Sequence, residues 1–373
     1  MRLTLVTVIG WHSVAVLFAM PAASTGSARQ TRDSTRLFTT FCRSCLLLYP
    51  RLNIGFRTRV PSREYPVRQS SFEAFLRQTQ AECRRMRKEE GRVSPYFLLD
   101  DKLSAYRFCD FHGFPRPRTD MFAIPLADLV PQSPCVIKPL GSVSSRGVFL
   151  LFSDTRVLEL STGKTYACWD EARLRARSLI DEKIIPQDAW VQEELLLQSD
   201  GTMAKDVKFY AFYGRTPLVL ETQRQPEIRR CWYDHKLQPT TTGKYSRRLF
   251  GGTGIPPEAQ RLAAEISLRI PLPFARIDLL ISRSGIHLGE ITPEPGRFNA
   301  FNDRSDMLLG AEMIAATARL ACDISSGKSF PNFEIFASSR RIMMQPQLDE
   351  GPTPGLPMPP PPLSRTTECT PTK

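Results

Sequence analysis

The spacing of apolar residues predicts several helices in the chain, separated by shorter strand-like runs. Residues 70–90 lack Pro and Gly and place their apolar side chains on one face, which predicts a basic amphipathic helix. A second helix is predicted at 100–112, with Asp100 or Asp101 as N-cap and Gly113 as its terminator. Further helices are expected near 169–179 and 257–268.

After Pro134 the pattern changes to short β-branched or aromatic runs, separated by glycines and polar turns. Together with the helices, these runs predict an α+β fold. The expected organisation is an N-terminal extension at 1–69, a helical region at 70–134, a mixed domain at 135–330 and a proline-rich, disordered tail at 331–373.

The first candidate site follows a short apolar run that ends in Lys138 and continues into a segment rich in Gly and Ser. Gly141 and Gly147 allow backbone N–H groups to approach phosphate oxygens, and Ser144 adds a donor. Lys138 places a cation at the base of this loop. Two interpretations remain open here, a phosphate cradle and an ordinary surface turn.

The second candidate is a strand-like run in which polar and apolar residues alternate. Because alternate residues of a strand share a face, Asp206, Lys208 and Tyr210 are expected on one side of a sheet. A lysine facing inward is costly without a partner, and a bound phosphate would remove that cost.

The third candidate is a predicted hairpin of residues 274–282 and 286–292. We expect a three-residue turn with Gly285 in its last position, because this connection commonly carries glycine there. In that register Asp278 faces Glu290 across the strands. A two-residue turn would place the two carboxylates on opposite faces.

The same register pairs Arg276 with Thr292, so all four polar groups share a face. Like charges directly opposite each other are destabilising, and the carboxylate pair therefore implies a compensating cation, for which Mg²⁺ is suited by its preference for oxygen ligands. The alternative is that the carboxylates form ion pairs with arginines such as Arg276 or Arg297.

Composition and charge indicate the compartment of the protein and the kind of partner it binds. Hydrophobic content of 42% and the lack of a long apolar stretch fit a protein without a transmembrane span. The net charge of +12 favours anionic partners, and peripheral contact with a membrane is compatible with it. Nine scattered cysteines, an odd number, favour a reducing, cytoplasmic compartment.

Residues 1–28 resemble a secretory signal, because an apolar run is followed by small residues. Trp11, His12 and Ser13 interrupt that run. A genuine signal and a wrongly assigned start both remain open, and we favour an unstructured or wrongly assigned extension.

Taken in order, these motifs resemble the ATP-grasp superfamily, in particular its TupA-like branch, which is associated with cell-surface polysaccharide and teichuronopeptide biosynthesis. The resemblance covers residues 100–315 and implies two α+β subdomains that clasp ATP, preceded by a helical region. The residues that carry it are Asp101-Lys102, Asp206-Val-Lys-Phe-Tyr, Arg276-Ile-Asp278, Gly289-Glu-Ile-Thr292 and Gly310.

The resemblance implies that Lys138 and Lys208 hold the phosphates of ATP, and that the loop from Gly141 to Gly147, with Ser144, closes over the nucleotide. The hinge strand that presents backbone groups to adenine would consist of Glu193, Glu194 and Leu195.

It further implies that Asp278 and Glu290 bind Mg²⁺ and that Arg276, together with Lys208, acts in catalysis by stabilising developing negative charge. Many ATP-grasp ligases have Asn two residues after the second carboxylate, whereas this chain has Thr292, as is usual for the TupA-like branch.

The implied activity is ligation of a carboxylate to an amine through an acyl phosphate, with ATP and Mg²⁺ as cofactors. The substrates would be a small-molecule or glycan-linked carboxylate and an amine, a homodimer is compatible with the family, and nucleic acid is not an expected partner. Two alternatives are an ATP-dependent phosphotransferase on the same site and a non-catalytic, basic protein that binds polyanions.

Overall fold

The computed structural model describes residues 70–90, 94–99, 101–141, 145–225, 227–330 and 333. The chain divides into two units, 1–66 and 67–373, and all described residues belong to the second. The predictions for the extension at 1–69 therefore lie outside the described residues, as do those for nearly all of the tail. Within the tail, Phe333 is buried and contacts Phe108 at 6.0 Å between ring centroids, so at this position the chain packs on the core.

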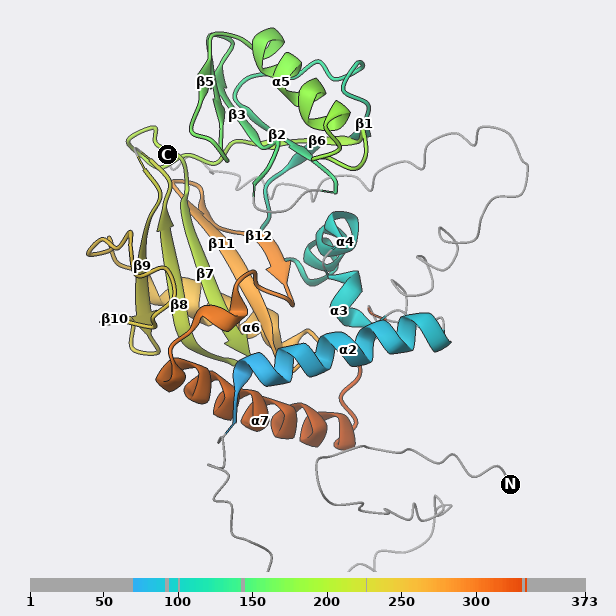
Figure 1. Ribbon diagram of the computed structural model, residues 1–373, viewed down its shortest axis with the longest axis vertical. Helices are drawn as coiled ribbons and strands as arrows, with labels where there is room; N and C mark the ends of the chain where they lie inside the picture. Colours follow the sequence, from blue (N-terminus) through green and yellow to red (C-terminus); the bar gives the residue numbers. More distant parts are fainter. Residues whose placement is uncertain are drawn as a thin grey trace, which may run out of the picture. The chain divides into compact units, whose positions relative to one another are not determined.

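The structure is mixed α+β, with two antiparallel sheets of six strands each (Figure 1). The helices are α2 (Phe72–Glu90), α3 (Pro95–Leu98), α4 (Lys102–His112), α5 (Trp169–Asp181), α6 (Pro257–Leu268) and α7 (Asp303–Ser325), with a 3-10 turn η1 at Phe298–Ala300. Nowhere in the described part of the chain does a helix reach the length and apolarity needed to cross a bilayer.

The first sheet has the order β1 (Thr119–Ile124), β6 (Trp190–Glu194), β2 (Cys135–Pro139), β3 (Phe149–Ser153), β4 (Arg156–Glu159) and β5 (Thr165–Tyr166). The second has the order β10 (Pro239–Thr240), β9 (Arg229–Asp234), β8 (Arg215–Gln223), β7 (Lys205–Phe212), β11 (Ala275–Ser282) and β12 (Gly285–Thr292). The region 70–134, predicted as helical, therefore also contains a strand, because β1 pairs with β6.

The helix α4 begins and ends as the sequence predicts. The side chain of Asp101 accepts a hydrogen bond from the backbone N–H of Ser104 at 3.0 Å, which satisfies one of the free amides of the first turn. Gly113 ends the helix in the left-handed conformation, with φ of 69°. The predicted helix at 257–268 coincides with α6, and those near 70–90 and 169–179 correspond to α2 and α5.

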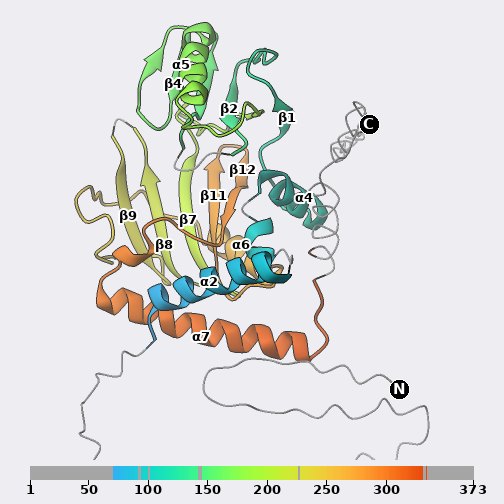
Figure 2. The same cartoon turned by 45° about the vertical axis from the view of Figure 1, so that its right-hand side comes forward.

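The two faces of the second sheet pack against different helices. On one face, the apolar residues Val207, Phe209 and Ala211 of β7 pack in a core with α6. On the other face, Tyr210 packs with Phe72 of α2 and with residues of α7, two helices that lie side by side across this face (Figures 1 and 2). Because strand residues alternate, Lys208 and Asp206 continue along the face of Tyr210.

The turn of the β11–β12 hairpin differs from the sequence prediction. Ser282 pairs with Gly285, so the turn contains two residues, whereas three were expected. In an unbroken ladder, this shorter turn would move Asp278 and Glu290 to opposite faces of the sheet.

A β-bulge in β12 restores the predicted pairing. Leu279 pairs with Leu288, whereas its neighbour Asp278 pairs with Glu290, so Gly289 is the extra residue that has no partner in the ladder. The bulge shifts the register by one residue between the turn and the carboxylates. Asp278 and Glu290 are therefore direct cross-strand partners, as predicted, although the predicted turn was wrong.

Candidate active site

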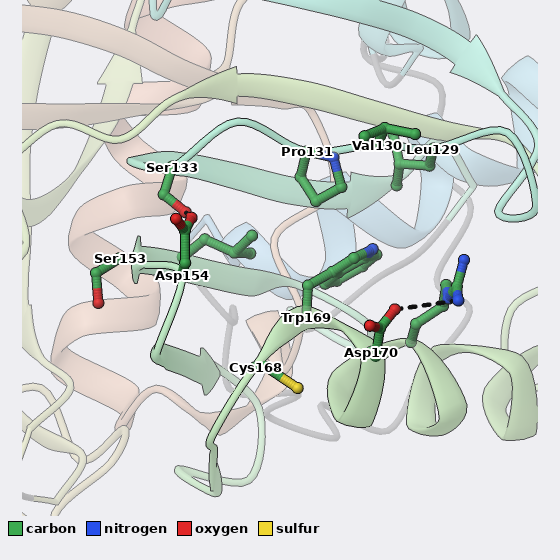
Figure 3. Close-up of a pocket in the computed structure, with 11 residues that line it drawn as sticks. Leu129, Val130, Pro131, Ser133, Ser153, Asp154, Cys168, Trp169 and Asp170 are labelled. Carbon is green, nitrogen blue, oxygen red and sulfur yellow. Dashed lines mark hydrogen bonds and ion pairs between the residues drawn. The ribbon is translucent and has the colours of Figure 1, made fainter.

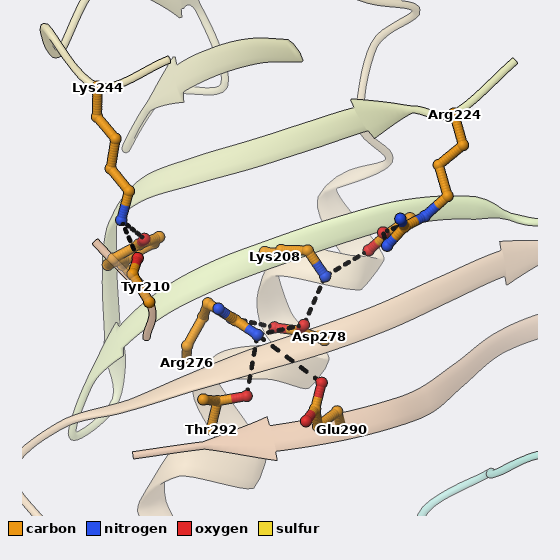
Figure 4. Close-up of polar contacts among 10 residues, drawn as sticks. Lys208, Tyr210, Arg224, Lys244, Arg276, Asp278, Glu290 and Thr292 are labelled. Carbon is orange, nitrogen blue, oxygen red and sulfur yellow. Dashed lines mark hydrogen bonds and ion pairs between the residues drawn. The ribbon is translucent and has the colours of Figure 1, made fainter. Parts of the chain in front are cut away.

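The structure brings four of the predicted site residues together on the second sheet. Lys208 of β7, Arg276 and Asp278 of β11, and Glu290 of β12 lie on adjacent strands (Figure 4). Asp278 is the cross-strand partner of both Lys208 and Glu290. The sheet therefore fixes the spacing of the polar groups through its backbone.

Lys208 bridges two buried carboxylates. Its Nζ lies 2.6 Å from Oδ2 of Asp278 and 2.8 Å from Oδ1 of Asp206. The lysine side chain retains 17% of its exposure, whereas the two carboxylates retain 6% and 8%. The inward-facing lysine is thus paired within the protein, and its ammonium group is already fixed in position.

Arg276 binds the same carboxylate from the other side. Its Nε donates to Oδ1 of Asp278 at 2.6 Å and its Nη2 donates to Oδ2 at 2.7 Å, a bidentate pair. The same Nη2 donates to Oγ1 of Thr292 at 2.9 Å and lies 3.8 Å from Oε2 of Glu290. Burial alone would lower the pKa of Arg276, but the charge and hydrogen bonds of Asp278 outweigh it and raise the pKa.

Arg224, which the sequence reasoning missed, completes the chain of ion pairs. Its Nη2 lies 2.6 Å from Oδ2 of Asp206, and its Nε donates to the same oxygen at 3.1 Å. Burial would raise the pKa of Asp206, yet the cations of Lys208 and Arg224 lower it. No periodicity marks Arg224, because it follows the end of β8.

Lys244 is a second residue that sequence reasoning missed. It lies in the segment between β10 and α6, only 2% of the residue is exposed, and its Nζ donates to the hydroxyl of Tyr210 at 3.0 Å and to the carbonyl of Gly296 at 2.9 Å (Figure 4). Burial, together with the charges of Arg276, Arg297 and Arg230, lowers the pKa of Lys244 to about 7. Near neutral pH this amine therefore exists in both protonation states.

Lys138 and Glu193 form a separate pair on the first sheet. Nζ of Lys138 lies 2.6 Å from Oε1 of Glu193, and the hydroxyl of Tyr106 donates to that oxygen. Burial and Glu193 together raise the pKa of Tyr106. The side chain of Glu193 is therefore occupied by Lys138 and Tyr106.

The other predicted nucleotide contacts that the structure describes lie at the end of β6 and in the connection between β2 and β3. The backbone N–H of Glu194 donates to the carbonyl of Arg118 at 2.9 Å, and Leu195 is buried. Gly141 is exposed, and Ser144 lies outside the described residues. Gly147 has φ of +70°, a conformation that other residues rarely adopt, and an added Cβ would also lie 2.6 Å from the terminal Cδ1 of Ile185, so the local backbone favours glycine there.

The carboxylates fit a metal held mainly by its nucleotide. Among the described residues, no group of three or more His, Cys, Asp or Glu side chains is placed to hold a metal ion. Mg²⁺ commonly uses one or two carboxylates and completes its shell with water and substrate phosphates. Asp278 and Glu290 provide two such carboxylates, although both oxygens of Asp278 already accept bonds from cations.

A pocket of about 370 Å³ lies elsewhere, against α5 and the first sheet (Figure 3). Its lining includes Leu129, Ser133, Trp169 and the paired Asp170 and Arg173. None of the predicted site residues lines it. The ion-pair network on the second sheet is therefore the candidate active site.

Comparison with solved structures gives three examples of partial likeness. A D-alanine–D-alanine ligase from Bacillus anthracis has 15% identity and a TM-score of 0.35, with 60% of this chain and 68% of that chain covered. For the ATP-grasp ligase PsnB complexed with minimal precursor, the identity is 14%, the TM-score 0.35 and the coverage 65% and 72%. For the D-cycloserine synthetase DcsG, the values are 17%, 0.37, 65% and 80%.

No curated protein sequence matches the chain. The model of the TupA-like ATPgrasp family matches residues 82–314, which is more than half of the chain. The matched segment begins within α2, ends within α7 and includes every strand of both sheets. This chain therefore belongs to the TupA-like ATP-grasp family.

Proposed function

We propose that this protein is a Mg-ATP-dependent ligase that joins a carboxylate to an amine through an acyl phosphate. Bound Mg-ATP would supply the phosphoryl group that activates the carboxylate. The observation that carries the proposal is the convergence of Lys208, Arg276, Asp278 and Glu290 on adjacent strands of one sheet, in a chain of the ATP-grasp family.

The network supports this role through its pre-formed cations. Lys208 and Arg276 are held on opposite sides of Asp278, so neither must be ordered when a phosphate binds. Cations that are fixed before the reaction stabilise developing negative charge without reorganisation. Asp278 and Glu290 would hold Mg²⁺, while Lys208 and Arg276 would contact phosphate and carboxylate oxygens.

The first sheet would provide the other side of the nucleotide site. Lys138 would contact phosphate after release from Glu193, and the segment Glu193 to Leu195 would present backbone groups to adenine. Gly141, Ser144 and Gly147 would belong to the covering loop. These assignments are supported by the family match.

The same proposal extends to the product of the reaction, the compartment of the enzyme and the class of acid that it uses. Membership of the TupA-like family supports a product that enters cell-surface polysaccharide biosynthesis, with a cytoplasmic enzyme that uses cellular ATP. A small-molecule or glycan-linked carboxylate would be the acid. This part of the proposal is tested by deleting the gene for this protein in its native host and analysing the cell-surface polysaccharide that the deletion strain makes.

The activity is tested by hydroxylamine trapping with Mg-ATP and pooled carboxylic acids. Hydroxylamine replaces the unknown amine, so an acyl phosphate yields a hydroxamate together with ADP. Wild type should give both products, whereas Lys208→Met and Glu290→Gln should not. The matched control is Lys236→Ala, which removes an exposed lysine from the turn between β9 and β10.

The outcomes separate the candidate functions. Nucleotide binding without hydroxamate, but with phosphate transfer to a hydroxyl acceptor, would favour the phosphotransferase. Absence of nucleotide binding by wild type would refute the proposal and favour a polyanion-binding protein.

A further inference from the structure

A group of cations surrounds one aromatic ring beside the network of ion pairs. The guanidinium carbon of Arg230 lies 4.1 Å from the ring centroid of Tyr245, and that of Arg297 lies 5.8 Å from it. Nζ of Lys244 lies 5.3 Å from the same centroid. The ring stacks on the buried Trp232 at an interplanar angle of 12°, so its position is fixed by the core.

These cations lack acidic partners. Within the described ranges, no carboxylate lies within 4.0 Å of the charged group of Arg230, Arg297 or Lys244, in contrast to Lys208 and Arg276. The ammonium group of Lys244 instead donates to two uncharged oxygens. Arg297 is exposed, whereas Arg230 is half-buried and Lys244 is buried. Buried charges are normally paired, so an anion bound here would supply the partner that Arg230 and Lys244 lack.

The electrostatics of the group agree with its geometry. Burial lowers the pKa of Arg230, as do the nearby charges of Arg224, Arg248 and Arg297, against the opposing effect of Tyr245. The pKa of Lys244 is lowered for the same kind of reason. An anion bound among these groups would offset the repulsion between the cations.

A buried hydroxyl adds an independent observation. Thr222 of β8 is the cross-strand partner of Arg230, and its Oγ1 has no hydrogen-bond partner among the described residues. Thr222 also pairs with Asp206, whose carboxylate belongs to the network of Lys208. The unpaired cation and the unpaired hydroxyl therefore arise at adjacent positions of the sheet.

The group is continuous with the proposed catalytic residues. Lys244 contacts Tyr210, and Tyr210 is the cross-strand partner of Arg276. Arg297 follows β12 and has the left-handed conformation, with φ of 55°. A molecule that reaches Arg276 could therefore extend toward Tyr245.

We infer that Arg230 and Arg297, together with Lys244, form a subsite for a second anionic group on the substrate that is ligated. The inference rests on the proposed function and deepens it. The anion is a carboxylate or a phosphate, because planar guanidinium groups bind both through paired hydrogen bonds. The preferred substrate is thus an acid or amine that carries an additional negative charge.

The test is calorimetric titration of the full-length protein with tricarballylate, inorganic phosphate and acetate, each with and without saturating Mg-AMP-PNP. Tricarballylate reports carboxylate binding and inorganic phosphate reports phosphate binding, whereas acetate carries one charge only. The variants are Arg230→Gln, Arg297→Gln and the double variant. Arg261→Gln is the matched control, because Arg261 is an exposed arginine on α6.

We expect wild type and Arg261→Gln to bind tricarballylate or phosphate more tightly than acetate. The double variant should bind that anion at least about tenfold more weakly, as expected for loss of charge-assisted bonds, while its affinity for Mg-AMP-PNP stays within about twofold. Arg230→Lys should recover part of the affinity, which excludes a folding defect as the cause.

Equal anion binding by wild type and the double variant, or no anion binding by wild type, would overturn the inference. Failure of the proposed function has a different signature. In that case Mg-AMP-PNP does not bind, while the titration without nucleotide still reports on the arginines.

Discussion

Replacing each of the two proposed metal ligands should affect activity alike but stability very differently. Asp278→Asn removes a buried charge that lies between Arg276 and Lys208, whereas Glu290→Gln removes a carboxylate that is 61% exposed and 3.8 Å from Arg276. Removing one partner of a buried ion pair costs about 3–5 kcal/mol. An exposed pair contributes less than about 1 kcal/mol.

The structure places the cost for Asp278→Asn near the lower end of that range. Lys208 keeps its bond to Asp206 at 2.8 Å, Arg276 keeps its bond to Thr292 at 2.9 Å, and the asparagine oxygen can still accept one bond. A loss of about 3 kcal/mol corresponds to a decrease in Tm of roughly 6–12 °C for a domain of this size. Glu290→Gln should change Tm by less than about 3 °C.

The assay combines thermal unfolding by circular dichroism, without nucleotide, with hydroxamate formation. Both variants should lose activity, and only Asp278→Asn should lose substantial stability. Full activity in Glu290→Gln would refute the metal role of the carboxylate pair. An unchanged Tm in Asp278→Asn would refute the structural reasoning about the buried network.

Three further predictions follow from the same geometry. Arg276→Lys keeps the charge but loses the bidentate pair with Asp278, so kcat should fall about 10²–10³-fold with little change in nucleotide affinity, measured by steady-state kinetics and calorimetry. The pKa of Lys244 is lowered to about 7 in the folded protein, so above that pH the unfolded chain binds more protons than the folded protein does. As the pH rises from 7 to 9, the free energy of unfolding of wild type should therefore increase by up to about 1.4 kcal/mol per pH unit relative to that of Lys244→Met. Urea unfolding at several pH values measures this difference. Gly147→Ala should be destabilised by about 1–3 kcal/mol even without nucleotide, because φ of +70° strains an alanine and the new Cβ would displace Cδ1 of Ile185 from 2.6 Å, and an unaltered Tm would contradict this.

Local chemistry explains why the helices could be predicted from the sequence. Asp101 caps α4 and Gly113 ends it through interactions within a few residues, and these are visible as residue types at fixed offsets. The bounds of α6 coincide with the predicted 257–268 for a similar reason, since Pro257 occupies its first turn. In both helices the ends are determined locally.

The hairpin shows the limit of this reasoning. The alternation of residues in β11 and β12 indicates which positions share a face, but a one-residue change in the turn reverses the assignment. The bulge at Gly289 reverses it again, so Asp278 and Glu290 meet although the turn is shorter than expected. The alternation of residues alone does not distinguish a hairpin with a two-residue turn and a bulge from a hairpin with a three-residue turn and no bulge.

The residues that sequence reasoning missed depend on contacts between distant segments. Asp206 and Arg224 lie 18 positions apart, and Lys244 reaches Gly296 across 52 positions. A lysine or arginine in an irregular segment has no periodic neighbours to indicate its direction. Its role becomes apparent only when the sheet brings Tyr210 and the segment after β12 to it.

The distribution of charge on this sheet face favours a binding site over purely structural ion pairs. If the carboxylates served only to neutralise nearby arginines, the cations of the face would be matched, as Lys208 and Arg276 are by Asp206 and Asp278. Arg230 and Lys244 are not matched among the described residues, and burial together with neighbouring cations lowers the pKa of each. Such an arrangement costs stability in the free protein and is relieved by a bound anion. The unmatched cations therefore support the proposed subsite for an anionic group of the substrate beside the network of ion pairs.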